Sequence, residues 1–288
     1  MLSPKKSLGQ HLLRCEWVIS ALIHVAEITK KDTILEVGPG TGILTRALAK
    51  HAKKVIAVEK DAAFIDTLRA GIPQNTEIIQ GDILRLLPNL LSSYNLQPNS
   101  YKLVSNIPYY LTSRLLRLLL AGDTKPETIV FTIQKEVAQR ITVKPPQMNL
   151  LALSVQSFGT PEIIKDIPAA CFSPKPKVDS AIIKISRISD KFFTENKIDQ
   201  KLFFNVVKRA FSQKRKLLSN SLASLAHPHT YPLRRRLSEA SPIGVGASTQ
   251  TIKTLFSSLG FSPNARPEEM SLAQWVRIVK AIAHNGDY

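Results

Sequence analysis

The sequence predicts an α/β fold in which a doubly wound parallel sheet is followed by a small C-terminal α-helical domain. In the first two thirds of the chain, short runs rich in Val, Ile and Leu alternate with segments of helical periodicity. The last third shows helical periodicity alone, interrupted by Pro and Gly. A length of 288 residues suits one large domain or two ordinary ones, and a hydrophobic content of 44% excludes a disordered chain.

The expected strands are apolar runs that each end at a polar residue or a glycine. In chain order they cover residues 33–37, 54–58, 76–80, 101–105, 128–133 and 180–185. Segments 42–50, 61–70 and 112–120 lie between them and carry apolar residues at helical spacing, with Asp61 as the expected N-cap of the second. Strands that are separated by helices in this way predict parallel pairing.

The helical part is expected to begin near residues 187–195, so we divide the chain into domains 1–187 and 188–288. Three stretches there have helical spacing: Phe203, Val206, Val207, Ala210 and Phe211; Leu217, Leu218, Leu222 and Leu225; and residues 272–283. We expect them to form a small helical domain.

The chain is strongly basic, with 39 Lys+Arg against 22 Asp+Glu and a formal net charge of +17. No acidic residue occurs between Asp199 and Glu239. This window holds Lys201, Lys208, Arg209, Lys214, Arg215, Lys216, Arg234, Arg235 and Arg236. A run of one sign is typical of a surface that contacts phosphates, so nucleic acid is the first expected partner and an anionic membrane the second. A patch that only increases solubility is the alternative.

Cysteine content and hydropathy indicate the expected cellular setting. Cys15 and Cys171 are too few for a disulfide framework or a four-thiolate zinc site, so we expect no metal and a reducing compartment. The N-terminus has no apolar run behind its charges, and the apolar stretch 115–121 is too short to span a bilayer. We therefore expect a soluble cytoplasmic protein.

Residues that bind ligands in α/β sheets follow three successive expected strands. The loop 38–42, Gly-Pro-Gly-Thr-Gly, follows the first, Glu59 follows the second and Asp82 follows the third. Such ligands bind outside the carboxyl ends of the strands. Glycines allow close approach of the backbone, an acid after the second strand suits ribose hydroxyls, and Asp82 can accept from the amine of adenine. The pattern predicts an adenosine site, and without the Lys of a phosphate loop ATP hydrolysis is not expected.

Residues 36–42, Glu59 and Gly81-Asp82 together resemble the seven-stranded S-adenosylmethionine-dependent methyltransferases. The resemblance implies a Rossmann-like seven-stranded sheet and S-adenosylmethionine as methyl donor. In that class the glycine loop passes the methionine part of the cofactor, the acid after the second strand holds the ribose, and the acid after the third holds the adenine.

Asn106-Ile107-Pro108-Tyr109 follows the fourth expected strand and resembles the Asn/Asp-Pro-Pro-Tyr motif of methyltransferases that modify planar nitrogens. The adenine N6 lone pair is delocalised into the ring, so N6 is a poor nucleophile that gains positive charge as the methyl group arrives. The Asn106 oxygen and the carbonyl of the next residue can accept hydrogen bonds from N6 and stabilise that charge. The ring of Tyr109 can stack on the base.

Three further segments, Ser7–Leu13, Phe131–Val137 and Phe172–Ser180, narrow the resemblance to the ribosomal RNA adenine dimethyltransferases. The chain is similar to the KsgA/RsmA family of the small subunit over nearly its whole length, including residues 210–220. The resemblance implies catalytic roles for Asn106, Pro108, Tyr109 and Phe172, and cofactor binding by His11, Leu13, Gly38, Glu59, Asp82 and Asn106. Lys144–Leu150 departs from the family by lacking its Tyr-Gly pair.

Several of these expected roles have alternatives. Gln10, His11 and Leu13 are expected to fold over the cofactor, His11 through polar or backbone contact, because it stands where the family often has Asn. Phe172 is expected to face Tyr109 across the target adenine, and the alternative is an aromatic residue of the core. Lys135 and Arg140 are expected on a helix that faces RNA or only solvent.

The resulting hypothesis is N6,N6-dimethylation of two adjacent adenosines near the 3′ end of small-subunit ribosomal RNA, by a monomer. Binding to RNA backbone would be through the basic helical domain. The alternatives are a large-subunit methyltransferase of the antibiotic-resistance type, a non-catalytic ribosome assembly factor, and a DNA adenine methyltransferase.

Overall fold

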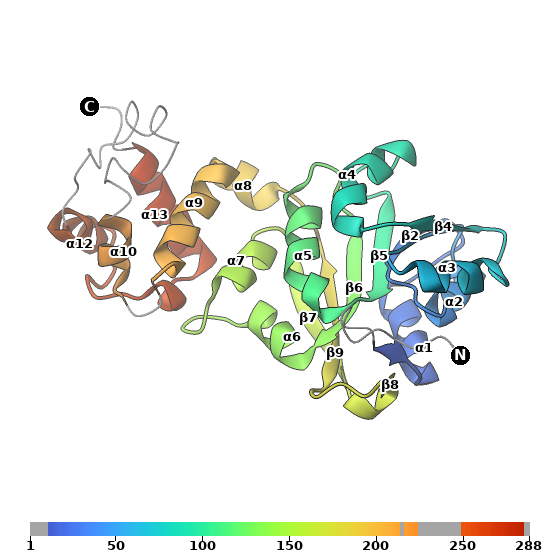
Figure 1. Cartoon of the computed structure of the whole chain (residues 1–288). Coiled ribbons are helices and arrows are strands. Elements are labelled where there is room, and N and C mark those ends of the chain that lie inside the picture. The colour runs from blue at the N-terminus through green and yellow to red at the C-terminus, as the bar shows by residue number, and fades with distance from the viewer. Residues whose placement is uncertain (1–10, 214–215, 224–248, 285–288) are drawn as a thin grey trace. The chain divides into compact units, whose positions relative to one another are not determined.

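The computed structural model describes residues 11–213, 216–223 and 249–284, and its main feature is a seven-stranded sheet (Figure 1). The strand order is β4-β3-β2-β5-β6-β9-β7. The strands are β2 (Thr33–Val37), β3 (Lys54–Glu59), β4 (Thr76–Gln80), β5 (Tyr101–Asn106), β6 (Thr128–Gln134), β7 (Thr160–Ile167) and β9 (Ser180–Ser186). The chain runs outward from β2 to β4 and then returns to the other side of β2 with β5. This switch point lies where a ligand is expected in such a sheet.

Six of the seven strands run in the same direction, and only β9 runs in the opposite one. β2 pairs in parallel with β3 and β5, β3 with β4, and β5 with β6. β9 is antiparallel to both of its neighbours, β6 and β7, so the prediction of a parallel sheet was wrong for this one strand. β7 was not among the strands expected from the sequence. Only Ile167 of this edge strand is buried, so β7 lacks the apolar run by which the other strands were found.

Both faces of the sheet are covered by helices. Consecutive residues such as Ile34 and Leu35 of β2, or Leu103 and Val104 of β5, point to opposite faces, and all four are fully buried. The helices of this unit are α1 (Glu16–Val25), α2 (Ile43–His51), α3 (Ala62–Arg69), α4 (Ile83–Ser93), α5 (Thr112–Ala121) and α6 (Lys135–Thr142), with short 3-10 turns η2 (Tyr109–Leu111) and η3 (Ala169–Cys171). Parallel strands joined by helices hold the loops after β2, β3, β4 and β5 at one edge.

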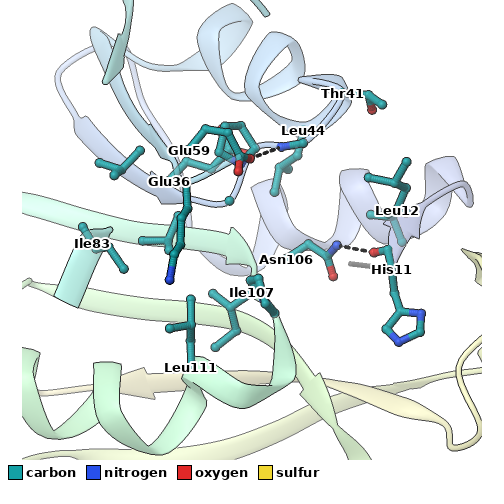
Figure 2. Close-up of a pocket in the computed structure, with 18 of the residues that line it drawn as sticks. His11, Leu12, Glu36, Thr41, Leu44, Glu59, Ile83, Asn106, Ile107 and Leu111 are labelled. Carbon is teal, nitrogen blue, oxygen red and sulfur yellow. Dashed lines mark hydrogen bonds between the residues drawn. The ribbon is translucent and has the colours of Figure 1, made fainter. Parts of the chain in front are cut away.

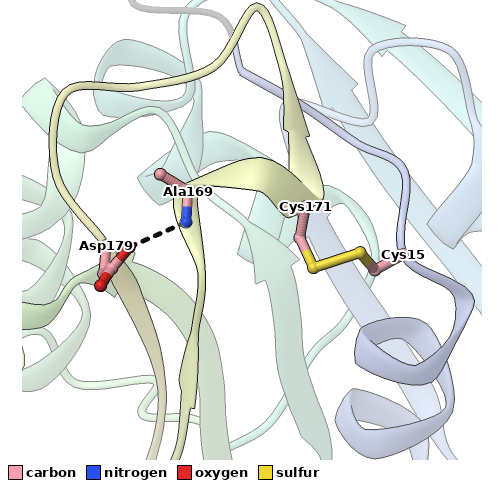
Figure 3. Close-up of a disulfide and its surroundings, with 4 residues drawn as sticks. All are labelled: Cys15, Ala169, Cys171 and Asp179. Atoms are coloured by element: carbon pink, nitrogen blue, oxygen red, sulfur yellow. Dashed lines mark hydrogen bonds between the residues drawn. A yellow bond between two sulfur atoms is a disulfide. The ribbon is translucent and has the colours of Figure 1, made fainter.

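Two short strands form a second sheet beside the main one. β1 (Leu12–Leu13) is antiparallel to β8 (Phe172–Ser173), with Leu13 opposite Phe172. The chain next to this sheet contains a disulfide between Cys15 and Cys171, whose Cα atoms lie 5.1 Å apart across a sequence separation of 156 (Figure 3). This bond was not expected from the sequence. We call residues 11–15 the N-terminal strap.

The chain divides into two compact units. The first contains residues 1–142 and 158–189, and the second contains residues 143–157 and 190–288. The longer segment of the second unit begins at Asp190, close to the expected boundary at residue 188. The second unit also takes in residues 143–157, which the sequence analysis assigned to the first domain.

The second unit is helical as far as the structure describes it. Its elements are α7 (Leu150–Gln156), α8 (Lys191–Asn196), α9 (Gln200–Phe211), α10 (Leu218–Ala223), α12 (Thr249–Ser258), η5 (Pro267–Glu269) and α13 (Leu272–His284). Its core includes the edge-to-face rings of Phe193 and Phe203 and the fully buried Trp275. The loop that departs from the family is anchored here, since the backbone N–H of Met148 donates to Glu268 O at 2.9 Å.

Part of the acid-free basic window can be located in this unit. Lys201, Lys208 and Lys216 are exposed, and Arg209 is partly buried. Lys214, Arg215, Leu225 and Arg234–Arg236 lie outside the described residues. Among the helices described, none has both the length and the apolar character needed to cross a membrane.

Candidate active site

A pocket opens at the carboxyl ends of β2, β3, β4 and β5 (Figure 2). It is lined by the strap, the glycine loop 38–41, the residues after β3 and β4, and the motif after β5. Eight predicted site residues line it together: His11, Leu13, Gly38, Glu59, Asp82, Asn106, Pro108 and Tyr109. Gln10 lies outside the described residues.

The glycine loop is closely packed between the strap and the Asn-Ile-Pro-Tyr motif. Gly38 has a φ of +70°, and a Cβ there would lie 3.3 Å from Cδ of Pro108. Gly40 has a φ of +55°, and a Cβ there would lie 2.9 Å from a methyl carbon of Leu12. Residues other than glycine are therefore disfavoured at both positions, because the backbone conformation is left-handed and a Cβ atom would be too close to its neighbours.

Glu59 is a buried acid at the end of β3. Its carboxylate accepts the backbone N–H of Gly40 at 3.0 Å and that of Asp61 at 2.8 Å, and the residue is 5% exposed. Burial raises the pKa of this carboxyl group, while the two backbone donors act in the opposite direction. The carboxylate thus fixes the glycine loop, and it retains acceptor capacity for the hydroxyls of a ribose.

Asp82 caps α4 and belongs to the same pocket. One carboxylate oxygen accepts the backbone N–H of Leu84 at 3.0 Å, and the other accepts from Nζ of Lys60 at 2.9 Å. The hydrogen bond from Lys60 lowers the pKa of Asp82, so the group is ionised at neutral pH. An ionised carboxylate at this position is an acceptor for the amine of a purine.

Glu36 is a pocket residue that the sequence analysis did not single out. It is 1% exposed, and one of its carboxylate oxygens has no hydrogen-bond partner among the described residues. Burial raises its pKa to about 8. The sequence feature that could have identified Glu36 is an acidic residue inside the apolar run 33–37. A carboxylate does not stabilise a strand that is buried on both faces, so its presence there indicates a functional role.

Asn106, the last residue of β5, is held at both ends of its carboxamide. Nδ2 donates to the backbone oxygen of His11 at 3.1 Å (Figure 2), and Oδ1 accepts from the hydroxyl of Thr132. The carboxamide is therefore fixed in rotation at the edge of the pocket.

Tyr109 lies in the same loop and is partly buried. Its hydroxyl is 2.7 Å from that of Ser180, and its ring centroid is 5.3 Å from the imidazole of His11. Burial raises the pKa of Tyr109, so the phenol is neutral at physiological pH. The residue supplies an immobilised aromatic ring at the pocket.

The structure does not place Phe172 at this pocket. Its ring is 3% exposed and belongs to the hydrophobic cluster formed with Leu13, Val18, Ile19 and Leu22. The pairing of β8 with β1 accounts for this position, because it brings Phe172 opposite Leu13 and beneath the strap. In this structure Phe172 is an aromatic residue of the core, which was the alternative to a place beside the target adenine.

The strap is tied to the segment around Phe172 by several contacts. Nδ1 of His11 lies 2.7 Å from the backbone oxygen of Pro174, and the N–H of Arg14 donates to Cys171 O at 2.8 Å. The disulfide from Cys15 to Cys171 adds a covalent link (Figure 3). These contacts of His11 lie within the protein, and its expected polar or backbone contact to the cofactor stays a prediction.

The basic residues expected on the helix after β6 are engaged with other groups. Nζ of Lys135 forms an ion pair with Asp166 at 2.6 Å, and Arg140 also has a partner. Both lie on α6, which the sequence analysis predicted.

The residues of the pocket fit S-adenosylmethionine. This cofactor carries a sulfonium and an ammonium group, and the pocket contains the buried carboxyl groups of Glu36 and Glu59. One oxygen of Glu36 has no hydrogen-bond partner among the described residues and is available to a ligand. Fold and pocket define an S-adenosylmethionine-dependent methyltransferase, and the roles of Glu59 toward the ribose and Asp82 toward the adenine stay predictions.

Comparison with known proteins gives the family. Residues 1–258 match the family model for ribosomal RNA adenine dimethylase. A "Ribosomal RNA small subunit methyltransferase A" of Dehalococcoides mccartyi is 37% identical over 287 residues, which cover 99% of this chain and 90% of that protein. A protein of the same name from Nostoc sp. is 36% identical over 292 residues, covering 98% and 99%. The chain belongs to the ribosomal RNA adenine dimethylase family.

Solved structures with the same fold match this chain over nearly its whole length. A dimethyladenosine transferase from Plasmodium falciparum superposes with a TM-score of 0.74 at 24% identity, covering 93% of this chain and 96% of that one. The 23S rRNA methyltransferase ErmE superposes with a TM-score of 0.64 at 24% identity, covering 94% and 99%. These similarities confirm the Rossmann-like methyltransferase fold with a C-terminal helical part.

Proposed function

We propose that this enzyme transfers methyl groups from S-adenosylmethionine to N6 of two adjacent adenosines near the 3′ end of small-subunit ribosomal RNA, forming N6,N6-dimethyladenosine. The observation that carries the chemistry is the carboxamide of Asn106, fixed at both ends beside the ring of Tyr109. The choice of subunit rests on the names of relatives that match over almost their whole length.

The cofactor would be held along the ends of β2, β3 and β4. We assign the ribose hydroxyls to Glu59, the purine amine to Asp82 and the cationic end to the region of Glu36 and Gly38. Leu13 and His11 would cover the pocket from the strap. When bound, S-adenosylmethionine supplies an electrophilic methyl group on a positively charged sulfur.

The target adenine would stack on Tyr109 and direct N6 toward Asn106. Oδ1 of Asn106 accepts one hydrogen bond from Thr132, which leaves a second lone pair for an N6–H. The backbone carbonyl of Ile107 would accept the other, with Pro108 fixing the loop. These acceptors stabilise the positive charge that N6 gains during transfer more than they stabilise the neutral amine. The alkylated nitrogen is acidic enough to release its proton to water.

Dimethylation requires the pocket to admit a monomethylated amine in a second round. Its remaining N6–H still has an acceptor in Asn106. The target base must leave its stack to reach Asn106, at a cost of about a few kcal/mol that contacts to the RNA backbone offset. We assign those contacts to the second unit, where Lys201, Lys208 and Lys216 are exposed. We further propose that the enzyme acts in the cytoplasm as a monomer.

The test is transfer of labelled methyl groups to unmethylated small and large ribosomal subunits, followed by nucleoside analysis. We expect dimethyladenosine in the small subunit alone, and we expect the Asn106→Ala variant to form none. Label in the large subunit would reassign the substrate to that of the resistance-type enzymes. Salt-sensitive binding to small subunits without any methyl transfer would favour an assembly factor over an enzyme.

A further inference from the structure

Thr132 lies beside Asn106 on the neighbouring strand. In the parallel pairing of β5 with β6, Asn106 is directly opposite Thr132, so their side chains project from the same face. The hydroxyl of Thr132 donates to Oδ1 of Asn106, and Thr132 is fully buried. The contact is thus made inside the protein, behind the pocket.

The network around Asn106 determines the direction of this hydrogen bond. The backbone carbonyl of His11 can only accept, so the amide nitrogen Nδ2 must face it. Oδ1 must then face Thr132, and the hydroxyl must be the donor. The two contacts together exclude the flipped carboxamide, in which Oδ1 would meet the carbonyl oxygen of His11.

Packing alone does not explain why this position of β6 carries a hydroxyl group. The neighbouring residues Val130, Phe131 and Ile133 are apolar and fully buried. Valine has nearly the same shape as threonine and would fill the site without a polar atom to satisfy. Among the residues that the structure describes, the hydrogen-bond partner of this hydroxyl is the carboxamide of Asn106.

We propose that Thr132 is a positioning residue for methyl transfer, which holds Oδ1 of Asn106 so that its second lone pair faces the target amine. The inference rests on the proposed role of Asn106 and deepens it. Thr132 does not line the pocket and acts through Asn106 alone. Its effect belongs to the methyl-transfer step, because the charge that Oδ1 stabilises develops there.

The test compares Thr132→Val, which keeps the shape, with Thr132→Ser, which keeps the hydroxyl. For both we would measure kcat and KM with unmethylated small subunits, the dissociation constant for S-adenosylmethionine by calorimetry, and Tm. We expect Thr132→Val to lower kcat about tenfold, while the dissociation constant changes less than about twofold. Thr132→Ser should retain at least about half of the wild-type kcat, although it loses a methyl group from the core.

A packing role would give the reverse order, with Ser impaired in Tm and activity and Val close to wild type. That order, or an unchanged kcat in Thr132→Val, would overturn the inference. The Asn106→Ala variant separates it from the proposed function. An inactive Asn106→Ala beside a fully active Thr132→Val refutes only the role of Thr132, whereas an active Asn106→Ala refutes the role of Asn106 itself.

Discussion

The side-chain nitrogen of Asn106 donates a hydrogen bond of 3.1 Å to the backbone oxygen of His11, 95 residues earlier in the chain (Figure 2). His11 is the first described residue of the strap. Its imidazole forms a hydrogen bond with the backbone oxygen of Pro174 and lies near the ring of Tyr109. Ordering of the strap and orientation of the reactive carboxamide are therefore coupled. A change that displaces the strap should reduce both cofactor binding and methyl transfer.

Gly40→Ala tests this coupling from the side of the glycine loop. The added methyl would lie 2.9 Å from Leu12 and force the strap or the loop to move. We expect the dissociation constant for S-adenosylmethionine to rise about tenfold or more. Gly260→Ala is the matched control, since Gly260 has a φ of +70° and open space around its Cβ position. Equal cofactor affinities in the two variants would contradict the coupling.

Asp82→Asn tests the assignment of the purine amine. Asparagine can still cap α4 through its side-chain oxygen, so Tm should change little. The second oxygen of Asp82 accepts from Lys60 in the wild type. In the variant it is replaced by an NH₂ group, which repels another hydrogen-bond donor. We expect affinity for S-adenosylmethionine to fall about tenfold in calorimetry. A normal affinity would show that the adenine binds elsewhere.

Much of the main sheet could be predicted from sequence because buried parallel strands are apolar and end abruptly. The bounds of β2 and β4 agree with the predicted runs 33–37 and 76–80. Strand ends of one direction meet at one edge, so Glu59, Asp82 and Asn106 could be grouped before any coordinates were known. The family resemblance added His11 and Leu13, which the periodicity of the chain does not connect to that edge.

Features that depend on strand register could not be predicted. The contact of Thr132 with Asn106 requires the alignment of β5 with β6, which no local pattern specifies. The burial of Phe172 and the approach of Cys15 to Cys171 both require the pairing of β1 with β8, two strands of two residues each. Such short strands give no periodic signal.

The disulfide gives a prediction about stability. It closes a loop with a sequence separation of 156, so its main effect is to restrict the unfolded chain. After oxidation with glutathione disulfide, the free energy of unfolding should exceed that of the reduced protein by up to about 5 kcal/mol. Urea unfolding with and without a phosphine reductant measures the difference. A Cys15→Ser, Cys171→Ser double variant should not respond to reductant, and equal stabilities of the two wild-type forms would argue against the bond.

Glu36 predicts a specific dependence of stability on pH. Burial raises its pKa from 4.5 to about 8 in the folded protein, so the folded state prefers the protonated acid. The stabilisation from this preference is complete below pH 4.5 and is lost as pH rises toward 8, because the unfolded chain ionises first. Glutamine at this position cannot ionise and carries no such loss.

The Tm of Glu36→Gln minus that of the wild type should therefore increase with pH. We expect this difference to grow by about 5–10 °C between pH 5 and pH 9, measured without cofactor. Taking the difference removes the contributions of all other titrating groups that the two proteins share. Glu77→Gln is the control, because its exposed carboxyl group has a pKa lowered by Tyr94 and Lys54, so it should give no such increase. A constant difference for Glu36→Gln would mean that the carboxyl group is ionised in the folded protein throughout this range. The wild-type pocket would then carry the negative charge of Glu36 in addition to that of Asp82 before the cationic cofactor binds.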